Sequence, residues 1–311
     1  ETLQFKDLSD PAPGAKQLLV RIEAAGVNFI DVYYRRGLYK VASHPYVPGL
    51  EGAGTVLAVG DGVTDFRVGD RVASSNFLGS YAEAALVAAD RAVPVPHGID
   101  ATAAAAVLLQ GMTAHYLVES TVKLGPGDRC LVHAAAGGVG LLLCQLARRR
   151  GARVIATVST AEKAQLARAA GAEVVIDYTT QDFVPEVARW TEGAGLDVVY
   201  DSVGRTTFDG SLRCLAPRGT LVLYGQSSGP VPPLDPQVLA QGGSLFLTRP
   251  ILGHYTRTRE ELLGRAQDLW SWMATGELEV KIGRTLPLAD AARAHQLLEG
   301  RETIGKVLLA P

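Results

Sequence analysis

Hydrophobic and polar residues follow two different rhythms along this chain. In the first third, short β-prone runs at 18–23, 52–59 and 69–72 are broken by Gly, Asp and Pro. Runs of this kind are typical of antiparallel strands joined by turns. We therefore expect a β-rich domain at the N-terminal end.

After an Ala-rich segment at 101–109, apolar runs alternate with helical stretches. The six strands that this alternation predicts lie at 130–134, 153–157, 173–176, 196–200, 220–224 and 244–247. Several of these runs are apolar almost throughout, as in strands that are covered on both faces. Helices are expected at 139–149 and 161–170, where each pattern stops at a Gly. The pattern predicts a doubly wound, parallel, six-stranded α/β sheet of the Rossmann type.

The C-terminal segment returns to a mixed pattern. It carries helical stretches at 260–273 and 290–298 and a strand-like run at 305–309, which we expect to pair with the first domain. The predicted division is a β-rich substrate domain, residues 1–111 and 250–311, and a dinucleotide-binding domain, residues 112–249.

Composition narrows the classes of partner. The chain has 311 residues, 47% hydrophobic and 20% charged, with a formal net charge of −2. Its Lys and Arg residues are scattered and form no basic stripe, so nucleic acid is not an expected partner. No uninterrupted apolar stretch approaches the ~18–20 residues of a membrane span, so no membrane partner is expected.

The cysteines indicate whether the protein is expected in an oxidising or a reducing compartment. Cys130, Cys144 and Cys214 are far apart and form no C-x-x-C pair, so they predict neither a disulfide framework nor a four-cysteine metal lobe. A reducing, cytoplasmic location is therefore expected.

A glycine-rich turn follows the predicted strand 130–134. The segment 135–140 reads AAGGVG, an A-x-G-x-x-G variant of the dinucleotide fingerprint, and runs directly into a helix. Gly137 would let the backbone approach a pyrophosphate, and Gly140 would let helix and strand pack closely. The alternative is a tight turn without a ligand.

The end of the next strand bears on the choice of nicotinamide cofactor. NAD enzymes place an Asp or Glu there for the ribose 2′-hydroxyl, whereas this chain has Ser159 and Thr160, with Lys163 one turn later. Two hydroxyls and an ammonium suit a 2′-phosphate, which favours NADPH. In the alternative reading, Ser159 only caps its helix in a capping box with Glu162, and Lys163 is a solvated charge.

With these motifs, the chain resembles the zeta-crystallin-like quinone oxidoreductases, the zinc-free branch of the medium-chain dehydrogenase/reductase superfamily. The segments that carry the resemblance are Gly26–Asp31, Gly37–Tyr39, Pro48–Gly54, His133–Gly140, Tyr200–Gly204 and Thr248–Pro250. The resemblance implies a GroES-like β-rich domain beside the Rossmann domain and NADPH-dependent reduction of quinones. It also implies a homodimer that pairs through the last strand, 244–247.

Two positions in the first domain predict that no zinc is used. Zinc-dependent relatives in the superfamily have a Cys where this chain has Asn28 and a His where it has Leu50. An amide and an isobutyl group cannot replace a thiolate and an imidazole on zinc. The six histidines show no H-x-x-x-H or H-E-x-x-H spacing, and His133 is expected to be structural. No metal site is therefore expected.

The resemblance also implies a set of site residues. Tyr39 is expected closest to the substrate, with Asn28 and Asp31 as orienting groups. Gln226 departs from the pattern, which has Asn there. The implied cofactor contacts are Asn28, Phe29, Ile30, Asp31, Val32, Tyr33, Thr113, Gly137, Gly138, Val139, Ser159, Thr160, Lys163, Tyr178, Ser202, Tyr224, Gly225, Gln226, Ser227, Pro250, Ile251, Leu252 and Arg301.

Each of these roles has a plainer alternative. Asn28 and Asp31 could simply begin a helix, Tyr39 could pack over the cofactor, Tyr224 could be a core residue, and Arg301 a solvated charge. Three functions stay open: reduction of a quinone, reduction of the double bond of an enone or 2-alkenal, and a non-catalytic crystallin-like or RNA-binding role.

Overall fold

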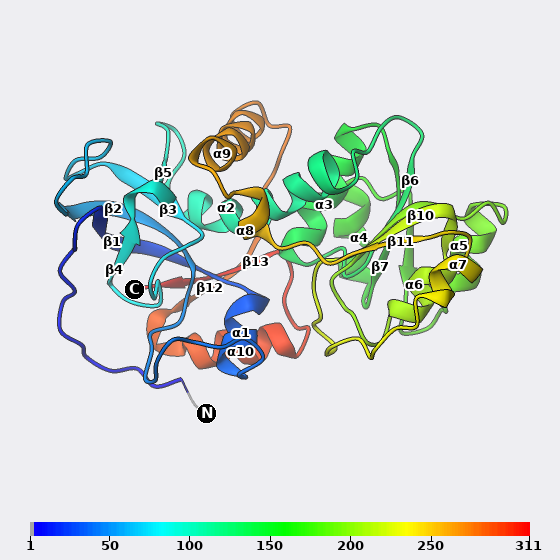
Figure 1. Ribbon diagram of the computed structural model, residues 1–311, viewed down its shortest axis with the longest axis horizontal. Coiled ribbons are helices and arrows are strands. Elements are labelled where there is room, and N and C mark those ends of the chain that lie inside the picture. Colours follow the sequence, from blue (N-terminus) through cyan, green and yellow to red (C-terminus); the bar gives the residue numbers. More distant parts are fainter. Residues whose placement is uncertain (1–2) are drawn as a thin grey trace. The chain divides into compact units, whose positions relative to one another are not determined.

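The computed structural model describes residues 3–311, and the chain divides into two compact units (Figure 1). Unit 1 combines the chain up to Met112 with Thr256–Pro311, and unit 2 is Thr113–Tyr255. Each unit has its own sheet and its own cluster of buried apolar side chains. The predicted fold class, a Rossmann-type parallel sheet with a separate β-rich unit, is confirmed.

Unit 1 is built on a seven-stranded sheet in the order β12-β13-β1-β2-β3-β5, with β4 also paired to β1. All pairs are antiparallel except β12 with β13. The strands are β1 (Gln17–Val27), β2 (Glu51–Val59), β3 (Arg71–Ser74), β4 (Ala84–Ala88), β5 (Val93–Pro94), β12 (Ile282–Pro287) and β13 (Lys306–Ala310).

The C-terminal strand β13 pairs with β1, with Ala25 opposite Leu309, so it joins the sheet of the first domain as predicted. Strand β12 was not predicted. The helical segments of this unit are α1 (Phe29–Arg35), η1 (Ala89–Arg91), α9 (Arg259–Ala274), η3 (Leu288–Asp290) and α10 (Ala291–Glu299).

Helix α2 (Ala101–Tyr116) continues into a π-helical turn, η2 (Leu117–Thr121). The 21 residues Ala101–Thr121 are long and apolar enough to cross a membrane by length and composition, which the sequence analysis did not expect. Most of their residues are buried inside the protein, and the core helix of a soluble protein meets the same two criteria. The helix is therefore weak evidence for a membrane span.

Unit 2 contains the parallel sheet, in the order β11-β10-β9-β6-β7-β8. Its apolar strands are buried between helices on both faces, α3 and α4 on one and α5, α6 and α7 on the other (Figure 1). The strands are β6 (Arg129–Val132), β7 (Arg153–Val158), β8 (Val174–Asp177), β9 (Leu196–Asp201), β10 (Leu215–Leu223) and β11 (Phe246–Thr248).

The helices of unit 2 connect these strands. They are α3 (Gly138–Arg149), α4 (Ala161–Ala169), α5 (Phe183–Trp190), α6 (Phe208–Arg213), α7 (Gln237–Gln241) and α8 (Leu252–Tyr255). One local prediction is wrong. Thr160, not Ser159, is the N-cap of α4, and its side chain accepts a hydrogen bond from the Lys163 amide. The helix itself begins at Ala161, as predicted.

Candidate functional site

Most of the predicted cofactor residues of unit 2 follow directly after its strands. Because all six strands are parallel, their carboxyl ends meet at one edge of the sheet. The predicted residues at this edge follow each strand in turn: Gly137–Val139 after β6, Ser159–Lys163 after β7, Tyr178 after β8, Ser202 after β9, Tyr224–Ser227 after β10, and Pro250–Leu252 after β11. Thr113 is buried within α2.

The turn between β6 and α3 has the geometry of an anion site. Gly137 is the N-cap of α3, with φ −74° and ψ 170°, and no side chain caps the helix. A Cβ on Gly140 would lie 2.5 Å from the Ala134 carbonyl oxygen and 2.7 Å from the Ala135 Cα, so only glycine fits there. The free amides of this first turn and the helix dipole fit a pyrophosphate.

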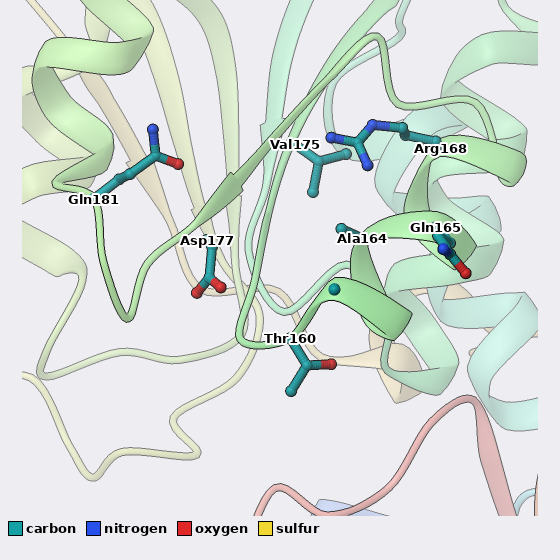
Figure 2. A pocket seen from close by; sticks show the side chains of 8 residues that line it. Thr160, Ala164, Gln165, Arg168, Val175, Asp177 and Gln181 are labelled. Atoms are coloured by element: carbon teal, nitrogen blue, oxygen red, sulfur yellow. The ribbon is translucent and has the colours of Figure 1, made fainter.

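The end of β7 presents hydroxyls and an ammonium. The Lys163 ammonium lies 3.4 Å from the Ser159 hydroxyl, so both polar groups stand together at the start of α4. Glu162 is exposed in the same turn. Beside them lies a surface pocket of about 360 Å³. Its lining comes from α4, β8 and the segment that follows β8, including Thr160, Arg168 and Asp177 (Figure 2).

A buried hydrogen-bond network fixes the strand ends beneath this edge. The His133 ring lies 3.0 Å from the Thr157 hydroxyl and 3.0 Å from the Ser211 hydroxyl. Ser211 donates to the Asp201 carboxylate at 2.9 Å, and the other oxygen of Asp201 accepts from the Gly204 amide. Burial lowers the pKa of His133, which favours the neutral ring. These contacts tie β6, β7 and β9 together, and His133 is engaged within them.

In unit 1, the predicted residues 28–33 form the beginning of α1. Asn28 is the N-cap of α1. The carboxylate of Asp31, the third residue of the helix, accepts a hydrogen bond from the backbone N–H of Asn28 at 2.9 Å. Tyr39 follows the helix and makes edge contacts with the rings of Tyr33 and Tyr34, at 5.5 and 5.6 Å between centroids. Arg301 lies in the turn after α10, in left-handed backbone conformation.

The Asn28 side chain is part of a buried polar cluster around an ion pair. Lys306 and Glu51, 1% and 0% exposed, form that pair. The Asn28 amide oxygen accepts from the Lys306 ammonium at 3.0 Å and from Gln110 at 3.1 Å, and its amide nitrogen donates to Glu51 at 2.8 Å. The cluster therefore occupies the polar atoms of Asn28. A Cβ on Gly26 would lie 2.8 Å from the Lys306 ammonium, so Gly26 leaves room for the pair.

Asp31 extends this cluster toward α10. Its Oδ2 also accepts a hydrogen bond from the Tyr81 hydroxyl, 3.2 Å away, and that hydroxyl lies 3.1 Å from His295 Nε2. Burial raises the pKa of Asp31 to about 7, against the opposing effects of the Asn28 backbone hydrogen bond and of the Lys306 charge. Burial also lowers the pKa of His295 to about 4, with help from the Arg35 charge. Near neutral pH, the Tyr81 hydroxyl thus joins a neutral imidazole to a carboxyl that can hold a proton.

Five members of this cluster were not predicted as site residues: Glu51, Tyr81, Gln110, His295 and Lys306. Lys306 does carry a signal, because it stands at the start of a run that is otherwise apolar through Leu309. A lysine in a buried strand needs an acidic partner. Naming Glu51 as that partner requires the pairing of β13 with β1 and of β1 with β2.

Metal ligands do not gather in the part of the chain that the structure describes. Among residues 3–311, no group of three or more His, Cys, Asp or Glu side chains is placed to hold a metal ion. Cys130, Cys144 and Cys214 are free thiols, each of them buried.

Comparison with known proteins covers nearly the whole chain. Residues 14–97 match the alcohol dehydrogenase GroES-like domain, and residues 138–267 match the family described as zinc-binding dehydrogenase. The quinone oxidoreductase of Pseudomonas aeruginosa is 46% identical, over 100% of this chain and 96% of its own length. The 2-haloacrylate reductase of a Burkholderia species is 44% identical, over 99% and 94%.

Solved structures give the same result. The structure of Escherichia coli quinone oxidoreductase complexed with NADPH superimposes with a TM-score of 0.96 at 44% identity, covering 99% of this chain and 95% of that one. The fold, the glycine turn and the sequence identity therefore agree. The chain belongs to the zeta-crystallin-like quinone oxidoreductase family of the medium-chain dehydrogenase/reductase superfamily.

Proposed function

We propose that this protein reduces quinones with NADPH and without zinc. The observation that carries the proposal is the carboxyl edge of the unit 2 sheet, where a glycine turn that excludes any Cβ at Gly140 stands beside Ser159 and Lys163. The relative of known structure from Escherichia coli is a quinone oxidoreductase that binds NADPH.

The residues at this edge fit the two charged parts of NADPH. The first-turn amides of α3 would hold the pyrophosphate, and Lys163 with Ser159 and Thr160 would hold the 2′-phosphate. A carboxylate after β7 would repel that phosphate, and Glu162, the nearby acid, is exposed in the first turn of α4. The remaining contacts, from Tyr178, Ser202, Tyr224–Ser227 and Pro250–Leu252, are proposed on their position at the same edge.

The independence from zinc rests on the cluster around Asn28. The polar atoms of its amide are already occupied, and Leu50 offers no lone pair where zinc enzymes have a histidine. The Lys306 ammonium supplies the cation next to Glu51 in this chain. A metal ion placed there would have to displace a buried ion pair.

The chain's own residues would bind and orient the reactants. Bound NADPH would supply the hydride. Transfer of this hydride needs no metal when the acceptor is a conjugated carbonyl. Tyr39, whose ring is held by Tyr33 and Tyr34, is proposed to line the substrate site. Asn28, whose side-chain amide is fixed by the cluster, would hold the start of α1 in place. Asp31, in the first turn of α1, is proposed as the second orienting group.

A second substrate class is favoured by one relative. The 2-haloacrylate reductase is as similar to this chain as several quinone oxidoreductases, and its name describes reduction of a conjugated double bond. An enone places a carbonyl oxygen in conjugation with the carbon that receives hydride, as a quinone does. The same site could therefore reduce both classes.

We further propose a cytoplasmic homodimer that binds neither membranes nor nucleic acid. Within the described chain, β11 pairs only with β10, and its Phe246 is 61% exposed. An edge strand with an exposed aromatic side chain suits isologous pairing with a second copy. Sedimentation equilibrium should give twice the monomer mass, and Phe246→Lys should shift the protein to monomers.

One experiment tests the proposed activity. The protein, dialysed against a strong zinc chelator, is assayed anaerobically for loss of NADPH with a panel of small quinones and enones. We expect turnover on quinones that the chelator leaves unchanged. Zinc-restored activity would refute the metal-free mechanism. Tight binding of NADPH without turnover on either panel would instead favour a non-catalytic role.

A further inference from the structure

The short helix α8 follows the last strand of the unit 2 sheet. It spans only Leu252–Tyr255, and all four of its residues are at least partly exposed. A single helical turn is not stable by itself, because forming it fixes several backbone angles for very few hydrogen bonds. The backbone of Pro250–Leu252, three of the predicted cofactor contacts, therefore depends on what holds α8 in place.

Tyr255, the last residue of α8, makes a stacked contact with Tyr116. The two rings are 4.2 Å apart between centroids, and their planes differ by 7°. Tyr116 is the last residue of α2 and is 2% exposed, whereas Tyr255 is half-buried. Both belong to unit 2. A stack of two flat rings restricts the distance and the tilt of the two segments that carry them.

The end of α2 is in turn attached to the sheet. The hydroxyl of Tyr200, a fully buried residue of β9, donates a hydrogen bond to the Leu117 carbonyl oxygen at 3.2 Å. The same oxygen accepts from the Val122 backbone N–H at 3.3 Å, at the end of the π-helical turn η2. The contacts therefore run from β9 through the end of α2 to Tyr116, and from Tyr116 to α8.

The strand order decides which half of the cofactor meets α8. In the order β11-β10-β9-β6-β7-β8, the glycine turn for the pyrophosphate follows β6, and the hydroxyls and ammonium for the 2′-phosphate follow β7. The adenosine half of NADPH thus lies on the β7 side of β6. The nicotinamide half must extend the other way, toward the ends of β9, β10 and β11, and α8 follows β11.

The stack also brings two groups of predicted contacts together. Thr113 stands three residues before Tyr116, and residues at this spacing share one face of a helix. Tyr255 packs on Tyr116, and from Tyr255 the chain leads back through one helical turn to Ile251. The Ile251 side chain is 53% exposed, and exposed apolar surface of this kind suits the face of a flat ring.

We propose that Tyr116 and Tyr255 are positioning residues, whose stack holds Pro250–Leu252 in place for the nicotinamide half of NADPH. The two tyrosines act through the backbone that they hold. This inference rests on the proposed function, because it assumes that NADPH binds along the carboxyl edge of the sheet.

Four variants separate the stack from general stability. Tyr255→Leu and Tyr116→Leu each remove the stack from one side and keep apolar bulk, whereas Tyr255→Phe keeps the ring. Trp190→Leu is the matched control. It removes the contact of the Trp190 ring with Arg153, at 4.8 Å, and Arg153 begins β7 at the opposite, amino edge of the same sheet.

The first readout compares two ligands by calorimetry and needs no turnover. Adenosine 2′,5′-bisphosphate has the adenosine and the 2′-phosphate of NADPH but no nicotinamide. Each Leu variant at Tyr255 or Tyr116 should raise the Kd of NADPH about threefold to tenfold and leave that of the bisphosphate unchanged. The double variant should lose no more than either single variant, because both remove the same contact. Tyr255→Phe and Trp190→Leu should bind both ligands as the parent does.

The second readout is kcat at saturating NADPH and quinone. It should fall about tenfold in Tyr255→Leu and Tyr116→Leu, because a displaced nicotinamide ring reacts more slowly. Tyr255→Phe should keep the parent's kcat. Unchanged binding of the bisphosphate shows in the same samples that unit 2 is folded.

Two results would overturn the role of the stack and leave the proposed function intact. One is an equal loss of affinity for NADPH and for the bisphosphate in Tyr255→Leu, and the other is a Tyr255→Leu variant with the parent's Kd and kcat. A parent that binds NADPH but reduces neither quinones nor enones would overturn the proposed function, and the two dissociation constants would still decide the role of the stack. A parent that does not bind NADPH would overturn both.

Discussion

Asp31→Asn should make the protein more stable at alkaline pH. The folded chain buries the Asp31 carboxyl at 1% exposure and raises its pKa from 3.8 to about 7. Folding therefore favours the protonated acid, and stability is lost as the pH rises from about 4 to about 7. The amide keeps both acceptor contacts of Oδ2 but cannot ionise, so the variant escapes this loss.

The size of the effect follows from the shift in pKa. A shift from 3.8 to about 7 corresponds to about 4 kcal/mol, at ~1.4 kcal/mol for each unit. Linkage places more than half of this change between pH 5 and pH 8. The stability difference between Asp31→Asn and the parent should therefore move by about that amount in favour of the variant over this interval.

Urea unfolding of the cofactor-free protein measures this difference. Trp270 and Trp272 on α9 report on unit 1 by fluorescence, and Asp61→Asn serves as the control with an exposed side chain. A stability difference between Asp31→Asn and the parent that is the same at pH 5 and pH 8 would refute the reasoning. It would mean that Asp31 is ionised throughout that range.

Three further substitutions test other parts of the structure. Lys306→Met should destabilise unit 1 by about 3–5 kcal/mol in urea unfolding, because it leaves Glu51 charged and buried. Adding Glu51→Gln should recover part of this loss, whereas full stability of the single variant would contradict the ion pair. Gly140→Ala should weaken NADPH binding at least tenfold and destabilise unit 2, because the new Cβ would lie 2.5 Å from the Ala134 carbonyl oxygen. Gly137→Ala, whose Cβ would lie 3.2 Å from the same oxygen, should keep the fold. In calorimetry, Lys163→Ala should raise the Kd of NADPH about tenfold and leave the Kd of NADH unchanged. An equal effect on both cofactors would mean that Lys163 does not bind the 2′-phosphate.

The sequence was sufficient for the parts of the fold that depend on local pattern. The buried run 130–134, the glycine turn and the next helix predict β6 and α3 because a strand, a tight turn and a helix each leave a local signal. The C-terminal strand was also predicted, since 305–309 is apolar except at Lys306. The start of α4 at Ala161 was predicted correctly, but its N-cap was placed one residue too early because Ser159 and Thr160 are both good N-cap residues.

Elements that are defined by their partners were predicted less well. Strand β12 (Ile282–Pro287) is mostly exposed and contains Gly, Arg and Pro, so its alignment with β13 supplies what its own sequence lacks. Strand β10 begins at Leu215, five residues before the predicted start, because a register shift lets it continue past Pro217 and Gly219.

The candidate site divides in the same way. Residues after the parallel strands could be named from sequence, since strand ends in such a sheet are local features. The cluster of Asn28, Asp31, Glu51, His295 and Lys306 brings together residues up to 278 positions apart. Only the pairing of β13 with β1 and the packing of α10 bring these side chains together, so their roles depend on tertiary contacts.

The amount of hydroquinone formed for each NADPH consumed, measured anaerobically with the chelator-treated protein, tests the central claim most directly. The account predicts one hydroquinone for each NADPH and a kcat/KM at least tenfold lower with NADH. An absence of hydroquinone above the uncatalysed rate, or equal rates with NADH and NADPH, would contradict it.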